Sequence, residues 1–240
     1  MKQEQQEIKN ALNNVRCAFR TLAQYQQGIL SIVNYIKNRS GIKDARFYGA
    51  KRFSNPIGKC QLKEEYDAKL AIFPDMWSWD FLYGYLFEYY LGAHSLNTKH
   101  GDKDVSLSII QVSDDGFIKS ETEKRSRLDI DSFNQPEHSN NWIIICVGYG
   151  HGWYYIPQIM TNDAYSPTTW SELAVQTTQY IINSSSDTYV NRVGVNGENC
   201  FFLAKRFPME DFFDAKSIDN LLIEFGEQLN QEEGIEIFRF

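Results

Sequence analysis

Two aspartates in the middle of the chain have a spacing that could hold a divalent metal ion. Asp129 and Asp131 are two residues apart in RLDIDSF, so both would point to the same side of a strand. Carboxylate oxygens are hard ligands of the kind that magnesium prefers. The same pair could instead hydrogen-bond to the backbone of a turn, and this alternative stays open.

A third acid and one histidine extend the metal hypothesis. Glu123 lies in ETEK (121–124), which is similar to the acid-x-lysine element of metal-dependent nucleases, where carboxylates hold magnesium and lysine contacts the attacked phosphate. His151 lies between two glycines at an expected hairpin tip, which would expose its ring to a ligand. A metal-dependent phosphodiesterase or nuclease is therefore the alternative hypothesis, and only this hypothesis implies a metal cofactor.

Residues 37–63 are strongly basic, with eight Lys and Arg side chains and a single acid, Asp44. RFY (46–48) and KRF (51–53) interleave cations with aromatic rings, a mixture that can bind phosphates and stack on bases. The net charge of −7 argues against a strong nucleic-acid binder, so the favoured counterpart is a protein or the acidic C-terminal region. The predicted anion- or partner-binding residues are Lys43, Arg46, Tyr48, Lys51, Arg52, Phe53 and Lys59.

Residues 74–92, PDMWSWDFLYGYLFEYYLG, concentrate aromatic side chains between a proline and a glycine. The Pro-Asp at the start and the glycine at the end are typical of helix boundaries, which predicts a buried aromatic helix. Asp80, Gly84 and Glu88 would form its only polar stripe. The two acids would lie about 12 Å apart, too far for a catalytic pair, and whether they line a pocket or face solvent stays open.

Residues 3–38 carry apolar side chains at spacings of three and four, which predicts one long amphipathic helix. The apolar positions are Ile8, Leu12, Val15, Phe19, Leu22, Ile29, Val33 and Ile36. Five of them repeat every seven residues, as in a coiled coil, but the stripe is broad and its flanks lack paired charges. We therefore expect residues 1–38 to form a helix or helical arm packed on the body, with a self-associating coiled coil as the alternative.

Later in the chain, apolar runs separated by turn signals predict strands. Three hairpins with tight turns are expected, within residues 106–120, 141–159 and 188–207. Helical spacing marks two later amphipathic helices, at residues 170–181 and 218–229, and IEIFRF is expected to form a closing strand. These elements predict an α+β fold with a mainly antiparallel sheet, in a single domain over residues 39–240.

The cysteines and the length of the apolar runs indicate the cellular compartment of the protein. The four cysteines lack the C-x-x-C pairing of a zinc site or a redox motif, so we expect free thiols. The start of the chain lacks the apolar core of a signal peptide, and no stretch approaches the roughly 20 apolar residues that cross a bilayer. We therefore expect a cytoplasmic protein with no membrane partner.

The polarised charge and the long helix favour a soluble, non-catalytic binding or regulatory protein without a cofactor. It would engage a partner macromolecule, or another copy of itself, through the basic segment 37–63 or through the first helix. Nucleic acid or a nucleotide is a second kind of partner that the basic segment would suit. A third hypothesis is a sugar or nucleotide pocket around Tyr83, Gly84 and His151.

Overall fold

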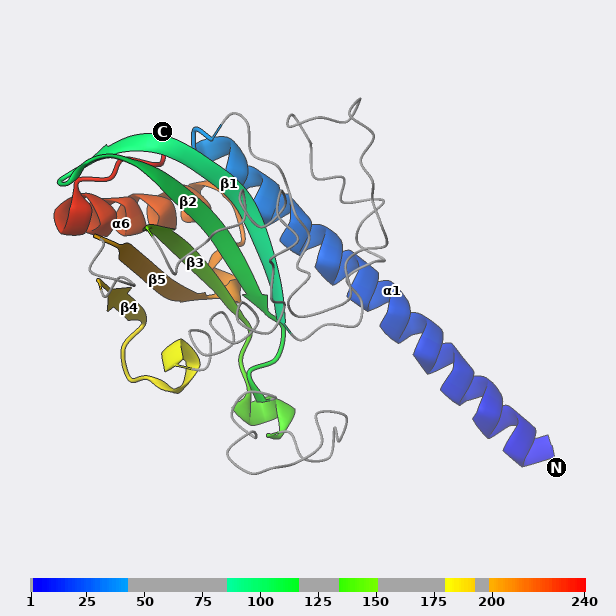
Figure 1. The fold of residues 1–240 in the computed structure, drawn as a ribbon. Helices are drawn as coiled ribbons and strands as arrows, with labels where there is room; N and C mark the ends of the chain where they lie inside the picture. Colours follow the sequence, from blue (N-terminus) through cyan, green and yellow to red (C-terminus); the bar gives the residue numbers. More distant parts are fainter. Residues whose placement is uncertain (1, 43–85, 117–133, 151–179, 193–198) are drawn as a thin grey trace, which may run out of the picture.

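The computed structural model describes residues 2–42, 86–116, 134–150, 180–192 and 199–240. The helices and strands in these ranges form an α+β fold, as the sequence predicts (Figure 1). In chain order they are α1 (Lys2–Arg39), β1 (Leu86–Thr98), β2 (Gly101–Val112), η4 (Pro136–His138), β3 (Trp142–Tyr149), β4 (Thr188–Asn191), β5 (Phe201–Pro208), η6 (Met209–Asp211) and α6 (Ala215–Glu233). Residues 180–183 add a helical turn before β4.

The described strands form one antiparallel sheet in the order β1-β2-β3-β5-β4. β1 and β2 are a long hairpin joined at Lys99 and His100. A bulge between Tyr90 and Gly92 shifts the register of β1, and Gly92 has a φ of 124° there. A residue with a Cβ rarely adopts this backbone conformation, which explains the glycine.

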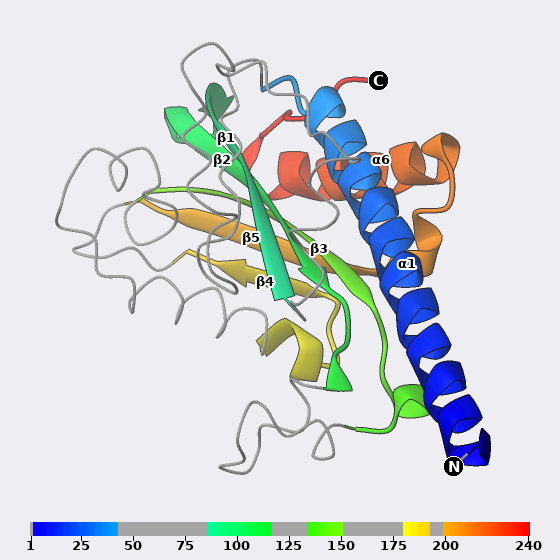
Figure 2. The same ribbon diagram turned by 90° about the vertical axis from the view of Figure 1, so that its right-hand side faces the viewer.

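α1 and α6 both lie on one face of the sheet (Figure 2). Side chains alternate between the two faces of a strand, and those that point toward the helices are apolar and buried. The strands contribute to this core residues such as Leu107, Ile109, Ile145, Val147 and Leu203. The helices contribute residues such as Ile29, Val33, Leu222, Phe225 and Leu229.

The opposite face of the sheet is buried as well. The residues that alternate with the helix-facing set include five that are 0 % exposed: Ser108, Ile110, Ile144, Cys146 and Ala204. Because both faces of β3 are buried, its sequence WIIICVGY is a nearly continuous apolar run instead of an alternation of apolar and polar residues.

α1 is a single helix of 38 residues, which confirms the element that the periodicity predicts. Its second half packs on the sheet, where Ile29, Val33 and Ile36 are at most 2 % exposed. The described side chains from Gln3 to Leu22 are all exposed, and this half of the helix projects away from the sheet (Figure 1). The helix therefore has a buried half and an exposed half.

The aromatic helix expected over residues 74–92 is wrong for its described part, because residues 86–92 belong to strand β1. The earlier part of the segment lies outside the described residues. Aromatic side chains favour strands when they can pack against a neighbouring layer. Phe87 and Tyr89 do so here, since both are buried in the core beneath the helices.

One of the three expected hairpins is confirmed, because β4 pairs with β5 from Thr188 and Lys205 to Asn191 and Phe202. The first strands of the other two are β2 and β3, whereas the residues expected to form their second strands, 117–120 and 151–159, lie outside the described residues. β2 has β1 and β3 along its edges, and β3 has β2 and β5. Both strands therefore lie in the interior of the described sheet.

The expected elements near the end of the chain have mixed outcomes. The last amphipathic helix is confirmed as α6, whereas most of the helix expected at residues 170–181 lies outside the described residues. IEIFRF is not a strand of the sheet. Ile235 and Ile237 are buried in the core, and the Arg239 N–H donates to the Arg39 carbonyl, so this segment packs beside the end of α1.

A buried hydrogen-bond network joins the second half of α1 to the β1–β2 hairpin. The Gln26 and Gln111 amides donate to each other's carbonyl oxygens at 3.0 Å. The Tyr89 hydroxyl accepts from Gln26 at 2.7 Å and donates to Gln111 at 2.6 Å. Burial raises the pKa of Tyr89 well above its usual value, which keeps this hydroxyl protonated. The network therefore fixes one register of the helix on the sheet.

We expect Gln26→Leu to destabilise the protein by about 1–3 kcal/mol, because it removes both buried hydrogen bonds between Gln26 and Gln111. Urea unfolding measures this change. Gln24→Leu, at an exposed position of the same helix, is the matched control and should change stability by less than about 0.5 kcal/mol. Equal stability of the two variants would contradict the role given to the network.

Candidate functional site: the exposed half of the first helix

The site residues predicted from the sequence lie outside the described residues. This holds for the metal, catalytic and pocket candidates Tyr83, Gly84, Glu123, Asp129, Asp131 and His151. It also holds for the predicted partner-binding residues Lys43, Arg46, Tyr48, Lys51, Arg52, Phe53 and Lys59. Their roles stay predictions. Within the described ranges, no group of three or more His, Cys, Asp or Glu side chains could hold a metal ion.

Glu88 is the member of the expected polar stripe that the structure describes, and its helical placement is wrong. It lies in β1, is 2 % exposed, and accepts a hydrogen bond from the Ser108 hydroxyl at 2.6 Å. Asp80 and Gly84 lie outside the described residues. Burial, and to a smaller extent the charge of Glu88, raises the pKa of Cys146 well above its usual value. This thiol therefore stays protonated at neutral pH and is a poor nucleophile.

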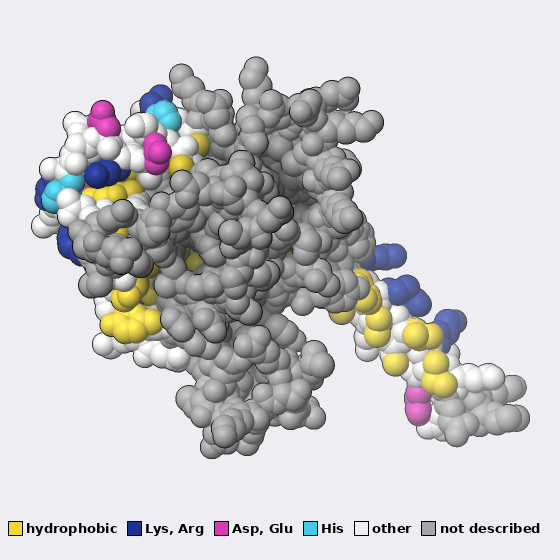
Figure 3. All heavy atoms as spheres, in the orientation of Figure 1, with side chains coloured by type: hydrophobic (Ala, Val, Ile, Leu, Met, Phe, Trp, Pro, Cys, Tyr) yellow, Lys and Arg dark blue, Asp and Glu magenta, His cyan; other side chains and the backbone are white. Residues whose placement is uncertain are grey.

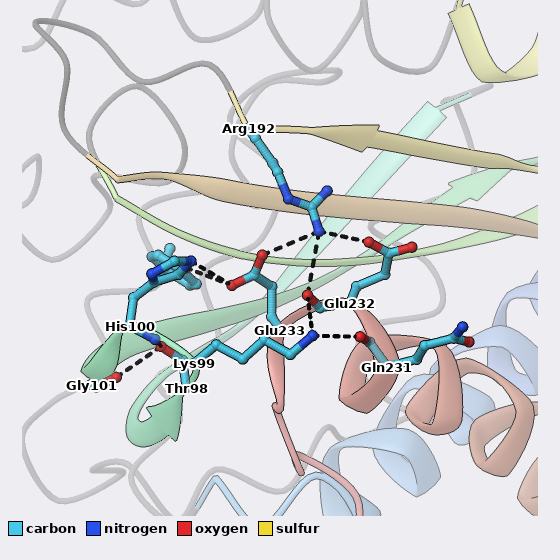
Figure 4. A network of polar contacts seen from close by, with 9 residues as sticks. Thr98, Lys99, His100, Gly101, Arg192, Gln231, Glu232 and Glu233 are labelled. Carbon is cyan, nitrogen blue, oxygen red and sulfur yellow. Dashed lines mark hydrogen bonds and ion pairs between the residues drawn. The ribbon is translucent and has the colours of Figure 1, made fainter.

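A second buried acid, Glu233, lies at the end of α6 among polar groups from the sheet (Figure 4). Its Oε1 is 3.2 Å from Nη2 of Arg192, and its Oε2 accepts from the Tyr149 hydroxyl at 2.9 Å. Nε2 of His100 lies 3.7 Å from the same Oε2. A buried carboxylate needs such partners to remain charged, and Arg192 supplies the opposite charge.

The surroundings of Glu233 are those of a helix end. Lys99 donates through Nζ to the Gln231 carbonyl at 2.7 Å and to the Glu232 carbonyl at 3.2 Å. Gly234 follows in the left-handed conformation that commonly ends a helix. A lysine at this end also interacts favourably with the helix dipole. We interpret the cluster as an anchor that joins α6 to the sheet.

Five large apolar side chains line the exposed half of α1, and we call them the apolar stripe. They are Ile8, Leu12, Val15, Phe19 and Leu22, with exposed fractions of 60, 53, 49, 38 and 42 %. Spacings of four and three residues place them on one face of the helix. Figure 3 shows this face as a yellow band along the projecting half.

The apolar stripe is continuous with the side of α1 that faces the sheet. The same alternation of four and three continues from Leu22 through Gln26, Ile29, Val33 and Ile36, and the last four of these residues are buried. The sheet therefore covers one face of the helix in its second half and leaves the same face exposed in its first half.

Basic side chains follow one edge of the apolar stripe. Lys9, Arg16 and Arg20, which we call the basic flank, are all exposed. Lys9 is three residues before Leu12, and Arg16 is three residues before Phe19, so both adjoin the stripe. Figure 3 shows basic side chains in dark blue beside the yellow band.

Covering the apolar stripe would release free energy of the same order as the cost of association. Complete burial of an exposed Val, Leu, Ile or Phe side chain contributes about 1.5–3 kcal/mol. The five side chains are already about half buried, so covering the stripe would contribute roughly 4–8 kcal/mol. This is of the same order as the cost of association, about 4–15 kcal/mol. Exposed apolar patches of this kind mark interaction sites.

The comparisons with known proteins give a family and no function. A family model, PM0109, matches residues 5–234. The chain belongs to the PM0109 family. Neither a curated protein nor a solved structure matches the chain. The family match includes the apolar stripe as well as the sheet and all of α6, so the projecting half of α1 is part of the family unit.

The anchor around Glu233 generates a prediction about alkaline pH. Burial, followed by the hydrogen bond to Glu233, raises the pKa of Tyr149 to about 12 from its usual 10. The folded protein therefore favours the protonated hydroxyl, and its contribution to stability is complete below pH 10 and is lost as the pH rises through about 12.

We expect Tyr149→Phe to lower the free energy of unfolding by about 1.5–3 kcal/mol at pH 8, because it removes a hydrogen bond to a charged group. The difference from the wild type should shrink between pH 10 and pH 12. Urea unfolding across this range measures it. A difference that stays constant up to pH 12 would contradict the role of the hydroxyl proton.

Proposed function

We propose that this chain is a non-catalytic binding protein that docks an α-helix of a partner on the apolar stripe of α1. The observation that carries the proposal is the exposure of Ile8, Leu12, Val15, Phe19 and Leu22 on one face of a helix. An amphipathic helix that lays its apolar face on another apolar surface is a common mode of protein recognition. We place this activity in the cytoplasm, as the sequence predicts.

The rest of the described structure, made of the sheet, α6 and the second half of α1, supports the exposed half of α1. The second half of α1 is fixed by the core and by the network around Gln26, so the exposed half starts from a rigid base. This base gives the exposed half a defined starting point and direction, which lowers part of the entropy cost of binding a partner. Among the described residues, no helix has the length and apolar character of a membrane span.

The basic segment 37–63 remains a second predicted contact. Lys37 and Arg39 at its start lie at the end of α1, and Arg39 pairs with Asp219 of α6 at 2.7 Å. The metal-dependent phosphodiesterase or nuclease is a hypothesis about residues outside the described ranges and stays a prediction.

The proposal predicts that Leu12→Glu/Phe19→Glu removes partner binding without unfolding the protein. Two buried apolar contacts would be lost, so affinity should fall at least ~100-fold. The measurement is capture of partners from an extract of the source cells by the tagged wild type and by the variant. The thermal midpoint should be nearly unchanged, because neither side chain contacts the core.

The matched control is Asn10→Glu/Cys17→Glu, which places two glutamates seven residues apart on the opposite, exposed face of the same helix. It should capture the same partners as the wild type. If the Leu12→Glu/Phe19→Glu variant retains every partner of the control, the apolar stripe is not the docking surface.

A further inference from the structure

We infer that the apolar stripe takes an amphipathic helix from a different protein, one that carries carboxylates beside its apolar seam, and not a second copy of this chain. The inference rests on the proposed function and adds to it the class of the partner. It follows from the charges beside the apolar stripe and from the burial, under the sheet, of the residues that continue the same face of α1.

The basic flank is a local exception in an acidic protein. The chain has a net charge of −7, whereas residues 5–22 contain three basic side chains, Lys9, Arg16 and Arg20, and one acid, Glu7. Among the described residues, no carboxylate lies within ion-pair distance of these three cations. Their charges are therefore available to a partner.

Two of these cations lie where a paired helix would meet them. Leu12 and Phe19 alternate with Ile8, Val15 and Leu22 as the two apolar positions of a seven-residue repeat. Lys9 and Arg16 then occupy the position directly beside this seam. Residues at such positions form ion pairs between helices and determine which partner is accepted. Carboxylates on the partner helix would complement both cations.

A second copy cannot lie parallel on the apolar stripe. The face of α1 that carries the apolar stripe continues under the sheet, where Gln26, Ile29 and Val33 are at most 2 % exposed. A parallel copy of α1 would continue beyond residue 23 into the space that the sheet occupies. The stripe thus accepts a partner helix of about 20 residues, or about 30 Å, that ends where the body begins.

An antiparallel second copy fits the length but has the wrong charges. In an antiparallel pair of helices, equivalent flanks face each other, so Lys9 of one copy would lie against Arg16 of the other. Because the pair is symmetric, this like-charge contact would occur twice. Repulsion at the flank disfavours self-pairing and selects for an acidic partner, which is specificity by exclusion.

The test uses two synthetic helical peptides of 21 residues with the same Leu and Ile seam and either Glu or Lys at the flanking positions. Like charges within each peptide keep it from pairing with itself. Fluorescence anisotropy with the full chain should give a dissociation constant about tenfold lower for the acidic peptide at low ionic strength. The preference should diminish as salt is added.

A charge-reversed variant makes the test specific. Lys9→Glu/Arg16→Glu should bind the Lys peptide more tightly than the Glu peptide, whereas Asn10→Glu/Cys17→Glu, on the opposite face, should keep the wild-type preference. Leu12→Glu/Phe19→Glu should bind neither peptide. Lys9→Glu alone should promote dimerisation, because it places a carboxylate against Arg16 of a second copy.

Three other outcomes would each contradict one claim of the proposal. Equal affinity of the wild type for both peptides would contradict the acidic partner and leave the proposed docking surface standing. Binding of neither peptide would contradict the proposed function itself. A wild-type dimer in sedimentation equilibrium that the Leu12→Glu/Phe19→Glu variant loses would show that a second copy is the occupant.

Discussion

The structure depends on one apolar face that runs along nearly all of α1 and is covered for only half of its length. From Gln26 to Ile36 this face meets the sheet and forms part of the core. From Ile8 to Leu22 the same face is exposed. Burial of apolar surface is the main favourable term in folding, so covering the exposed half as well would be favourable. The body supplies one cover, and we propose that a partner supplies the other.

The sheet and α6 hold α1 firmly from Gln26 onward, where the buried half of the helix begins. Gln26, Tyr89 and Gln111 form a satisfied polar network there, and the Arg39–Asp219 ion pair ties the far end of the helix to α6. The anchor around Glu233 fixes the opposite end of α6 to the sheet. These contacts hold the second half of α1 in place on the sheet, so the exposed half extends from a fixed support.

Much of this arrangement could be predicted from periodicity, and the rest could not. The spacing of Ile8, Leu12 and the later apolar residues predicts the whole of α1, but the length over which a sheet covers it depends on tertiary packing. Residues 86–92 were open to misassignment because an aromatic run has no alternation when both faces of its strand are buried. Turn signals likewise located strand ends but could not show which strand edges were already occupied. The apolar stripe was thus visible in the sequence, whereas its exposure was not.

Hydrogen exchange along α1 tests this account most directly. An isolated helix of about 20 residues is only marginally stable in water, so amides from residue 8 to residue 22 should exchange much faster than those from 26 to 36 in the free protein. The acidic peptide should slow exchange in the first group and leave the second unchanged. Equal protection of both groups in the free protein would mean that the protein already covers the apolar stripe, and would contradict the account.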